Sequence, residues 1–231
     1  MSPSSAVEAL SAVFQVREPD DGEVALHVLL TWHDDDSWAL PGGPVGERET
    51  LATAALRHLA AASGLTRIAH LEQLSVLSDP DRVPDVRTIA STYLGLVHRD
   101  VPADSVSQDG APATACWFDV DRLPTLAYDH ADIVALARAR IAAKLSYTNL
   151  AFALAPSRFA MSELSEIYGA ALGYPVDATN LLRVLSRRGV VVSTGTVGRT
   201  GRHGGRPPAL YTFADDRLVV TDEFATLRPP P

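Results

Sequence analysis

The sequence has few of the features that mark a secreted or membrane-bound protein. Its 231 residues include a single cysteine, Cys116, so an internal disulfide is impossible. Residues 1–7 lack the basic and apolar stretches of a signal peptide, and no apolar run is long enough to cross a membrane. We therefore expect a cytoplasmic protein without a membrane partner.

Positive charge is also scarce. Lys144 is the only lysine among 20 basic residues, against 28 acidic residues, which gives a formal net charge of −8. This charge argues against non-specific binding of nucleic acid by the whole surface, although it leaves room for a local basic patch. The hydrophobic fraction of 46% is ordinary for a folded protein, and the length allows one large or two modest domains.

The first part of the chain, residues 1–145, is predicted to mix strands with two helices. The expected strands are residues 9–16, 24–32, 71–78, 88–98 and 113–119. A glycine-rich loop at residues 41–43 precedes an expected helix at residues 50–63, which ends at Gly64, and a second helix is expected at residues 131–145. This order favours an α+β sandwich.

The pattern changes in residues 146–231, which we expect to form a second domain. A helix is predicted at residues 162–171 with Ser162 as its N-cap, and another runs from the cap Asp177 to residue 188. Two strands, residues 190–193 and 210–213, then pair as a hairpin. Two helices followed by a hairpin predict a winged helix-turn-helix, a fold that binds double-stranded DNA.

Acidic residues are absent between Leu181 and Phe213. The residues that we expect to contact DNA are Asn180, Arg183, Arg187, Arg188, Arg199, Arg202 and Arg206. Asn180, Arg183 and Arg187 share one helical face, and Asn and Arg are suited to reading adenine and guanine in the major groove. The alternative is a solvated basic helix face followed by a flexible linker.

Four residues of the first domain, Gly43, Glu49, Arg57 and Gly64, have the spacing of a known motif. They resemble the frame of a Nudix box, G-x5-E-x7-R-E-U-x-E-E-x-G-U, where U is a bulky aliphatic residue. Residues 38–43, 87–89 and 126–131 also resemble segments of Nudix proteins that act on ADP-ribose. The resemblance implies a Nudix-like domain, an α/β/α sandwich, with its box at residues 43–65.

The box lacks the carboxylates that the family uses to bind magnesium. Its three glutamate positions hold His58, Ala61 and Ala62. Glu47 and Glu49 remain, but they precede the expected helix, where a solvated loop and a first-turn acid explain them. His58 could be a solvated histidine or, as the alternative, a substitute ligand for the metal. We expect no catalytic residue, no bound metal and no required cofactor.

The whole chain resembles the Nudix-related transcriptional regulators (NrtR). In the second domain the resemblance rests on residues 159–164, 167–168, 178–183 and 204–211. It implies a homodimeric repressor of NAD biosynthesis genes, which ADP-ribose or a related nucleotide releases from its operator. The residues that it implies for the ligand are Gly42, Gly43, Arg57 and Arg87. Two alternatives stay open, a magnesium-dependent ADP-ribose hydrolase and a sugar-responsive regulator on the same fold.

Overall fold

The structure is a computed structural model that describes residues 5–18, 22–33, 36–102, 114–198 and 207–222. The chain forms two compact units. The first comprises Met1–Gln15, Leu26–Val97 and Val101–Arg138, and the second comprises Val16–Ala25, His98–Asp100 and Ala139–Pro231. Among the described residues, no helix combines the length and the apolar character needed to cross a membrane.

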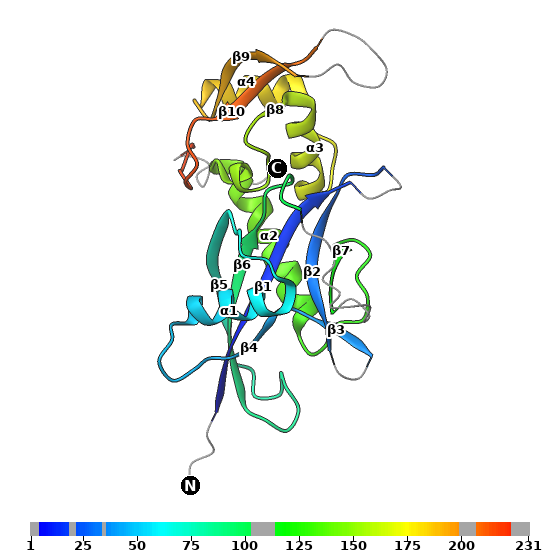
Figure 1. Ribbon diagram of the computed structural model, residues 1–231, viewed down its shortest axis with the longest axis vertical. Coiled ribbons are helices and arrows are strands. Elements are labelled where there is room, and N and C mark those ends of the chain that lie inside the picture. Colours follow the sequence, from blue (N-terminus) through cyan, green and yellow to red (C-terminus); the bar gives the residue numbers. More distant parts are fainter. Residues whose placement is uncertain (1–4, 19–21, 34–35, 103–113, 199–206, 223–231) are drawn as a thin grey trace, which may run out of the picture. The chain divides into compact units, whose positions relative to one another are not determined.

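A mixed sheet is the centre of the first unit (Figure 1). Within the described ranges its seven strands are β1 (Ala6–Arg17), β2 (Ala25–His33), β3 (Ser37–Ala39), β4 (Gly42–Pro44), β5 (His70–Leu77), β6 (Thr88–Leu96) and β7 (Ala115–Asp119). The main strand order is β3-β2-β1-β6-β5, while β4 pairs with β1 and β7 pairs with β2. Strands β1 and β6 are parallel, whereas the pairs β1–β4, β2–β3, β2–β7 and β5–β6 are antiparallel.

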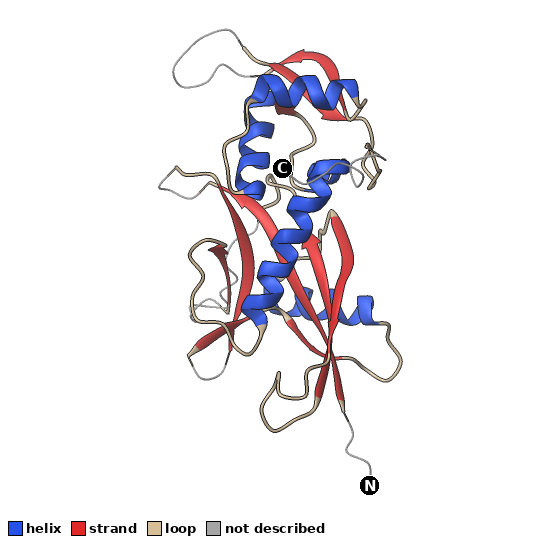
Figure 2. Cartoon of the chain, turned by 180° about the vertical axis from the view of Figure 1, so that it is seen from behind, coloured by secondary structure: helices blue, strands red, loops and turns tan. Residues whose placement is uncertain are grey.

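Helices cover both faces of this sheet (Figures 1 and 2). Helix α1 (Leu51–Ser63) lies on one face, and the first half of α2 (His130–Tyr147) lies on the other. Residues 9–16 of β1 are consequently all buried, without the alternation of a strand that has one wet face. The predicted α/β/α sandwich is confirmed.

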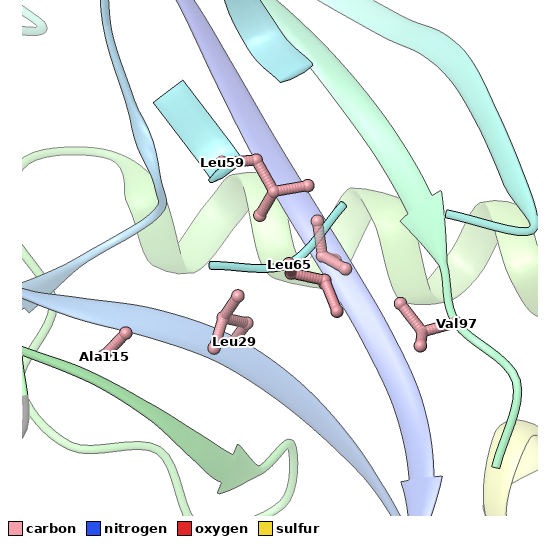
Figure 3. Close-up of a cluster of buried hydrophobic side chains, with 6 residues drawn as sticks. Leu29, Leu59, Leu65, Val97 and Ala115 are labelled. Atoms are coloured by element: carbon pink, nitrogen blue, oxygen red, sulfur yellow. The ribbon is translucent and has the colours of Figure 1, made fainter. Parts of the chain in front are cut away.

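The core beneath α1 joins the helix to three strands and to the segment that follows it. Leu59 of α1 and Leu65 pack with Leu29, Val97 and Ala115, whose side chains converge in Figure 3; Val13 belongs to the same cluster. Leu59 is completely buried, so truncating it to alanine is expected to destabilise the fold by about 2–5 kcal/mol. This packing fixes α1, which carries the box residues, against the sheet.

The second unit has the predicted winged helix-turn-helix order. Its elements after α2 are η1 (Leu150–Ala153), β8 (Phe159–Ala160), α3 (Met161–Leu172), α4 (Ala178–Arg187), β9 (Val191–Val197) and β10 (Ala209–Phe213). The strands form a sheet in the order β8-β10-β9. Leu164 and Ile167 of α3 are fully buried, and Leu185 of α4 nearly so, as their helical spacing predicts.

Two local predictions are wrong. Residues 41–43 are not simply a loop, because Gly42–Pro44 pairs with β1 as strand β4. Ser162 does not cap α3; the N-cap is Ala160, which makes no side-chain capping bond. Ala160 is held in an extended conformation by its pairing with Leu210, so the helix begins directly after that short strand.

Helix α2 belongs in part to each compact unit. The compact units divide inside α2, between Arg138 and Ala139. The last residue of α2, Tyr147, accepts backbone hydrogen bonds from Thr221 and Asp222, which ties this end of the helix to the second unit. The expected domain boundary at residues 145 and 146 lies in the last turn of this helix and stays a prediction.

Candidate functional site

The Gly-Gly segment of the first unit is pressed against its neighbours. A Cβ atom on Gly42 would lie 2.4 Å from Cδ2 of Leu10 and 2.6 Å from the carbonyl oxygen of Ala9. A Cβ atom on Gly43 would lie 2.5 Å from the ring of His58. The contact with the Ala9 backbone is too short for any Cβ atom, so at Gly42 strand β4 approaches β1 as closely as only glycine permits, while Gly43 leaves room for the His58 ring.

Glu49 and Arg57 form an ion pair between the box loop and α1. Arg57 Nε donates to Glu49 Oε2 at 3.0 Å, and Arg57 Nη2 donates to Glu49 Oε1 and to the carbonyl oxygen of Pro44. The backbone N–H of Gly46 also donates to Glu49 Oε1, at 2.6 Å. The hydrogen bonds from Arg57 and Gly46 lower the pKa of Glu49 to about 2.

Arg57, the box arginine, therefore has an acidic partner in Glu49, although the three metal-binding glutamates of the box are missing. Both oxygens of Glu49 accept hydrogen bonds from Arg57, so neither is presented as an open metal ligand. Glu49 also precedes the N-cap Thr50, so it is not the first-turn acid that the sequence suggests. Its role in the structure is to connect the loop to the helix.

The box positions do not fit a magnesium site. Ala61 and Ala62 carry no ligand atom, and Nε2 of His58 donates to the carbonyl oxygen of Pro44 at 2.9 Å. Magnesium prefers oxygen ligands, so a histidine and two alanines cannot replace three carboxylates. In the described ranges, no three His, Cys, Asp or Glu side chains gather as they would around a metal ion.

Arg87, the remaining residue expected to bind the ligand, lies directly before β6. Its Nη1 donates to the carbonyl oxygen of Ser78 at 2.6 Å, and its own carbonyl oxygen accepts from the backbone N–H of Ala6. The structure thus places Arg87 at the start of a central strand, bonded to the turn between β5 and β6. A ligand would have to compete with Ser78 for this guanidinium group.

A buried ion cluster in the first unit was not predicted from the sequence. The guanidinium of Arg82 donates to both oxygens of Asp129, at 2.7 and 2.9 Å, and to Glu8 at 2.6 Å. Only 1% of the Arg82 side chain is exposed. Burial disfavours its charge, but the hydrogen bonds to Asp129 and Glu8 outweigh burial and raise the pKa of Arg82.

His130, next to that cluster in sequence, fixes the approach to the Gly-Gly segment. Its Nδ1 accepts from the backbone N–H of Leu40 at 3.0 Å, and Ala127 N donates to Trp38 O nearby. Burial lowers the pKa of His130 to about 4, so the ring is neutral at pH 7. Residues 38–43 and 126–131, two segments that suggested the family, are therefore bonded to each other.

The second unit presents a polar helix face on α4. Asp177 caps the helix, because its Oδ1 accepts from the backbone N–H of Asn180 at 2.7 Å. Asn180, Arg183 and Arg187 are all exposed, and Arg183 Nη2 donates to Asn180 Oδ1 at 2.7 Å. The opposite face buries Leu181 and Leu185, so packing orients the polar face outward.

The other expected DNA contacts differ from these three. Arg188 is directed into its own unit, where Nη2 bonds Asp222 at 2.6 Å and Nη1 bonds the carbonyl oxygen of Ser146. The wing arginines Arg199, Arg202 and Arg206 lie outside the described residues.

Family comparisons match both units. The NUDIX domain profile matches residues 10–137, and the profile of the NrtR DNA-binding winged helix domain matches residues 151–213. The chain is 28% identical to the ADPR responsive transcriptional repressor NtrR of Acinetobacter baylyi, over 92% of this chain and 83% of that protein. It is also 34% identical to an ADP-ribose pyrophosphatase of Methanocaldococcus jannaschii, but over only 42% of this chain and 54% of that enzyme.

Solved structures show the same combination of domains. The crystal structure of Shewanella oneidensis NrtR complexed with a 27mer DNA matches with a TM-score of 0.73 and 25% identity, over 90% of this chain and 93% of that chain. A MutT/nudix family protein from Enterococcus faecalis matches with a TM-score of 0.73 and 20% identity, over 93% of this chain and 90% of that chain. The second match is a likeness of fold alone.

Proposed function

This chain belongs to the Nudix family and carries an NrtR DNA-binding winged helix domain, and we propose that it is a transcriptional repressor controlled by a nucleotide. As a homodimer it binds a near-palindromic operator in front of NAD biosynthesis genes. ADP-ribose or a related nucleotide binds the Nudix unit and releases the DNA. The similarity to the ADPR responsive repressor of Acinetobacter baylyi, over 92% of this chain, supports this proposal.

The observation that carries the DNA-binding part is the outward face of α4. Asn180, Arg183 and Arg187 are exposed there on a helix whose opposite face is buried. Amide and guanidinium groups supply the paired donors and acceptors that distinguish bases in the major groove. The position of α4, second helix of the matched winged helix domain, is the position of a recognition helix.

The effector part of the proposal uses the box region without metal chemistry. Gly42 and Gly43 form strand β4 beside the box, and Arg57 and Arg87 supply guanidinium groups that suit phosphate oxygens. For release to occur, the nucleotide must bind the DNA-incompetent state more tightly than the DNA-competent state. A ligand with equal affinity for both states would not act as an inducer.

The chain acts as a sensor and not as a hydrolase. The positions of the family's metal-binding glutamates hold His58, Ala61 and Ala62, and Arg57 donates hydrogen bonds to both oxygens of Glu49. The pyrophosphatase of Methanocaldococcus jannaschii is the observation in favour of hydrolysis. Incubation with ADP-ribose and Mg²⁺ separates the two functions: the sensor releases no AMP, whereas AMP formation that is lost in Glu49→Gln would establish an enzyme.

Fluorescence anisotropy of a labelled operator tests the regulator. The DNA fragment is the region upstream of the NAD biosynthesis genes, titrated with the full chain with and without ADP-ribose. We expect salt-sensitive binding that ADP-ribose reverses. Binding unaffected by ADP-ribose but reversed by a sugar would assign the sugar-responsive alternative, and absence of binding at low salt to this region and to the chain's own promoter would overturn the repressor.

A further inference from the structure

Beyond the matched winged helix domain, the chain folds back along the end of α2. Residues 215–222, which we call the C-terminal strap, follow β10 in the second unit. The side chain of Asn149 is buried and bonds three backbone groups of the strap, accepting from Val219 N and donating to the carbonyl oxygens of Arg217 and Asp215. The strap is therefore attached at several points to the segment that ends α2.

The strap continues to the end of α4 through a shielded ion pair. Thr221 N and Asp222 N donate to the carbonyl oxygen of Tyr147, which places the Asp222 carboxylate beside Arg188. The Arg188–Asp222 distance is 2.6 Å, and the two side chains are only 15% and 10% exposed. Arg188 is the C-cap residue of α4, so the pair connects the end of that helix to the strap.

We propose that the strap positions α4 for DNA, and that Arg188 is a positioning residue that does not contact DNA. This proposal rests on the DNA binding proposed above and adds the means by which α4 is oriented. Arg188 also donates to the carbonyl oxygen of Ser146, so one guanidinium joins α4, the strap and the end of α2. The profile of the winged helix domain ends at residue 213 and contains neither Ser146 nor Asp222.

The orientation of a recognition helix decides which of its side chains reach the bases. Helix α4 has ten residues, and its buried leucines fix which face points outward. The pair at its last turn adds a constraint on the angle of the helix. Loss of either partner leaves the other charge shielded and unpaired, which the structure relieves by moving the end of the helix.

The direction in which one substitution changes operator affinity distinguishes a positioning role from a simple effect of charge. Asp222→Asn removes a negative charge from the DNA-binding unit, which by charge alone should strengthen binding to DNA. If Asp222 holds Arg188 in place, the same substitution weakens operator binding instead. Asp216→Asn is the matched control, because Asp216 is an exposed carboxylate of the same strap.

The experiment measures operator anisotropy for the full chain and both variants. We expect Asp222→Asn to weaken operator binding by about tenfold while Asp216→Asn leaves it equal or stronger. ADP-ribose binding, followed by tryptophan fluorescence, should be unchanged, since Trp32, Trp38 and Trp117 all belong to the first unit. If Asp222→Asn binds the operator equally well or more tightly, the proposal that the strap positions α4 is wrong. If the wild-type chain does not bind the operator, the proposed repressor function itself is wrong.

A rescue variant tests whether Arg188 contacts a DNA phosphate directly. Arg188→Met removes the charge in either case and weakens binding. In Arg188→Met/Asp222→Leu the pair is replaced by apolar side chains of similar size that can pack together, so operator affinity should recover in part. A double variant that binds no better than Arg188→Met, with a salt dependence flattened by one charge in both, would assign Arg188 to the DNA.

Discussion

The buried imidazole of His130 makes the folded chain sensitive to acid. Its pKa is lowered by burial to about 4, whereas the ordinary value is 6.5. Between these values the unfolded chain binds a proton that the folded chain excludes. The stability contributed by the neutral His130 ring is therefore fully present above pH 6.5 and is lost as the pH falls towards 4. The free energy of unfolding should fall by at most about 1.4 kcal/mol per pH unit from this residue.

Urea unfolding between about pH 7 and pH 4.5 measures this contribution. His130→Asn keeps an acceptor for the backbone N–H of Leu40 but carries no titrating ring. We expect a shallower dependence of stability on pH in the variant than in the wild type. Parallel curves would show that His130 does not take up the proton on unfolding.

Arg183 is the residue whose loss should most directly reduce operator recognition. It is exposed on α4 and bonded to Asn180, which holds both side chains on the outward face. Arg183→Ala should weaken operator binding by about 1–3 kcal/mol if the guanidinium reads a base. Arg67→Ala is the control, because Arg67 is an exposed arginine of the first unit. An equal loss in both variants would mean that only total charge matters.

At this scale the sequence predicts residue types and faces better than partners. The spacing of Asn180, Arg183 and Arg187 correctly predicts a shared exposed face. Arg82 lies between two expected strands, residues 71–78 and 88–98, yet its side chain is buried and forms ion pairs with Asp129 and Glu8. Arg188 belongs to the same basic run as Arg187, but its partner Asp222 lies 34 positions along the chain. Ion pairs over such separations leave no local pattern.

The N-cap of α4 is the element-scale feature with the clearest energetic consequence. Asp177 accepts from the backbone N–H of Asn180, so Asp177→Ala should destabilise the second unit by about 0.5–2 kcal/mol, while Asp177→Asn retains the cap. Thermal unfolding followed by circular dichroism compares the variants. The same midpoint for alanine and asparagine would show that the cap contributes nothing.

The longer elements could be predicted, and the shortest could not. Strands β1, β2, β5, β6 and β7 and helices α1 to α4 can be identified by a long apolar pattern or by a capping residue. Strands β4 and β8 contain three and two residues, too few for any period. Their pairing depends on β1 and β10, which are distant in sequence, so only the folded chain shows it.

For the whole molecule, the net charge of −8 and DNA binding are compatible because the charge is unevenly distributed. Leu181 to Phe213 contains no acidic residue, so α4 and the hairpin form a basic segment on an acidic chain. Such a segment attracts phosphates locally while the remaining surface is repelled. Operator binding should therefore decrease with salt according to the few phosphates contacted, and not according to the total charge.

A homodimer on a symmetric operator makes a geometric prediction. Light scattering should give about twice the chain mass of 24.7 kDa, and the two recognition helices should contact half-sites about one helical turn apart, roughly 34–36 Å. Insertion of about 5 base pairs between the half-sites turns one of them to the opposite side of the duplex and should abolish tight binding. Insertion of about 10 base pairs returns both half-sites to the same side of the duplex, so the operator should be bound more tightly than after the shorter insertion. Equal binding to all three operators would indicate that each chain recognises its half-site independently, and the dimer would then have no part in operator selection.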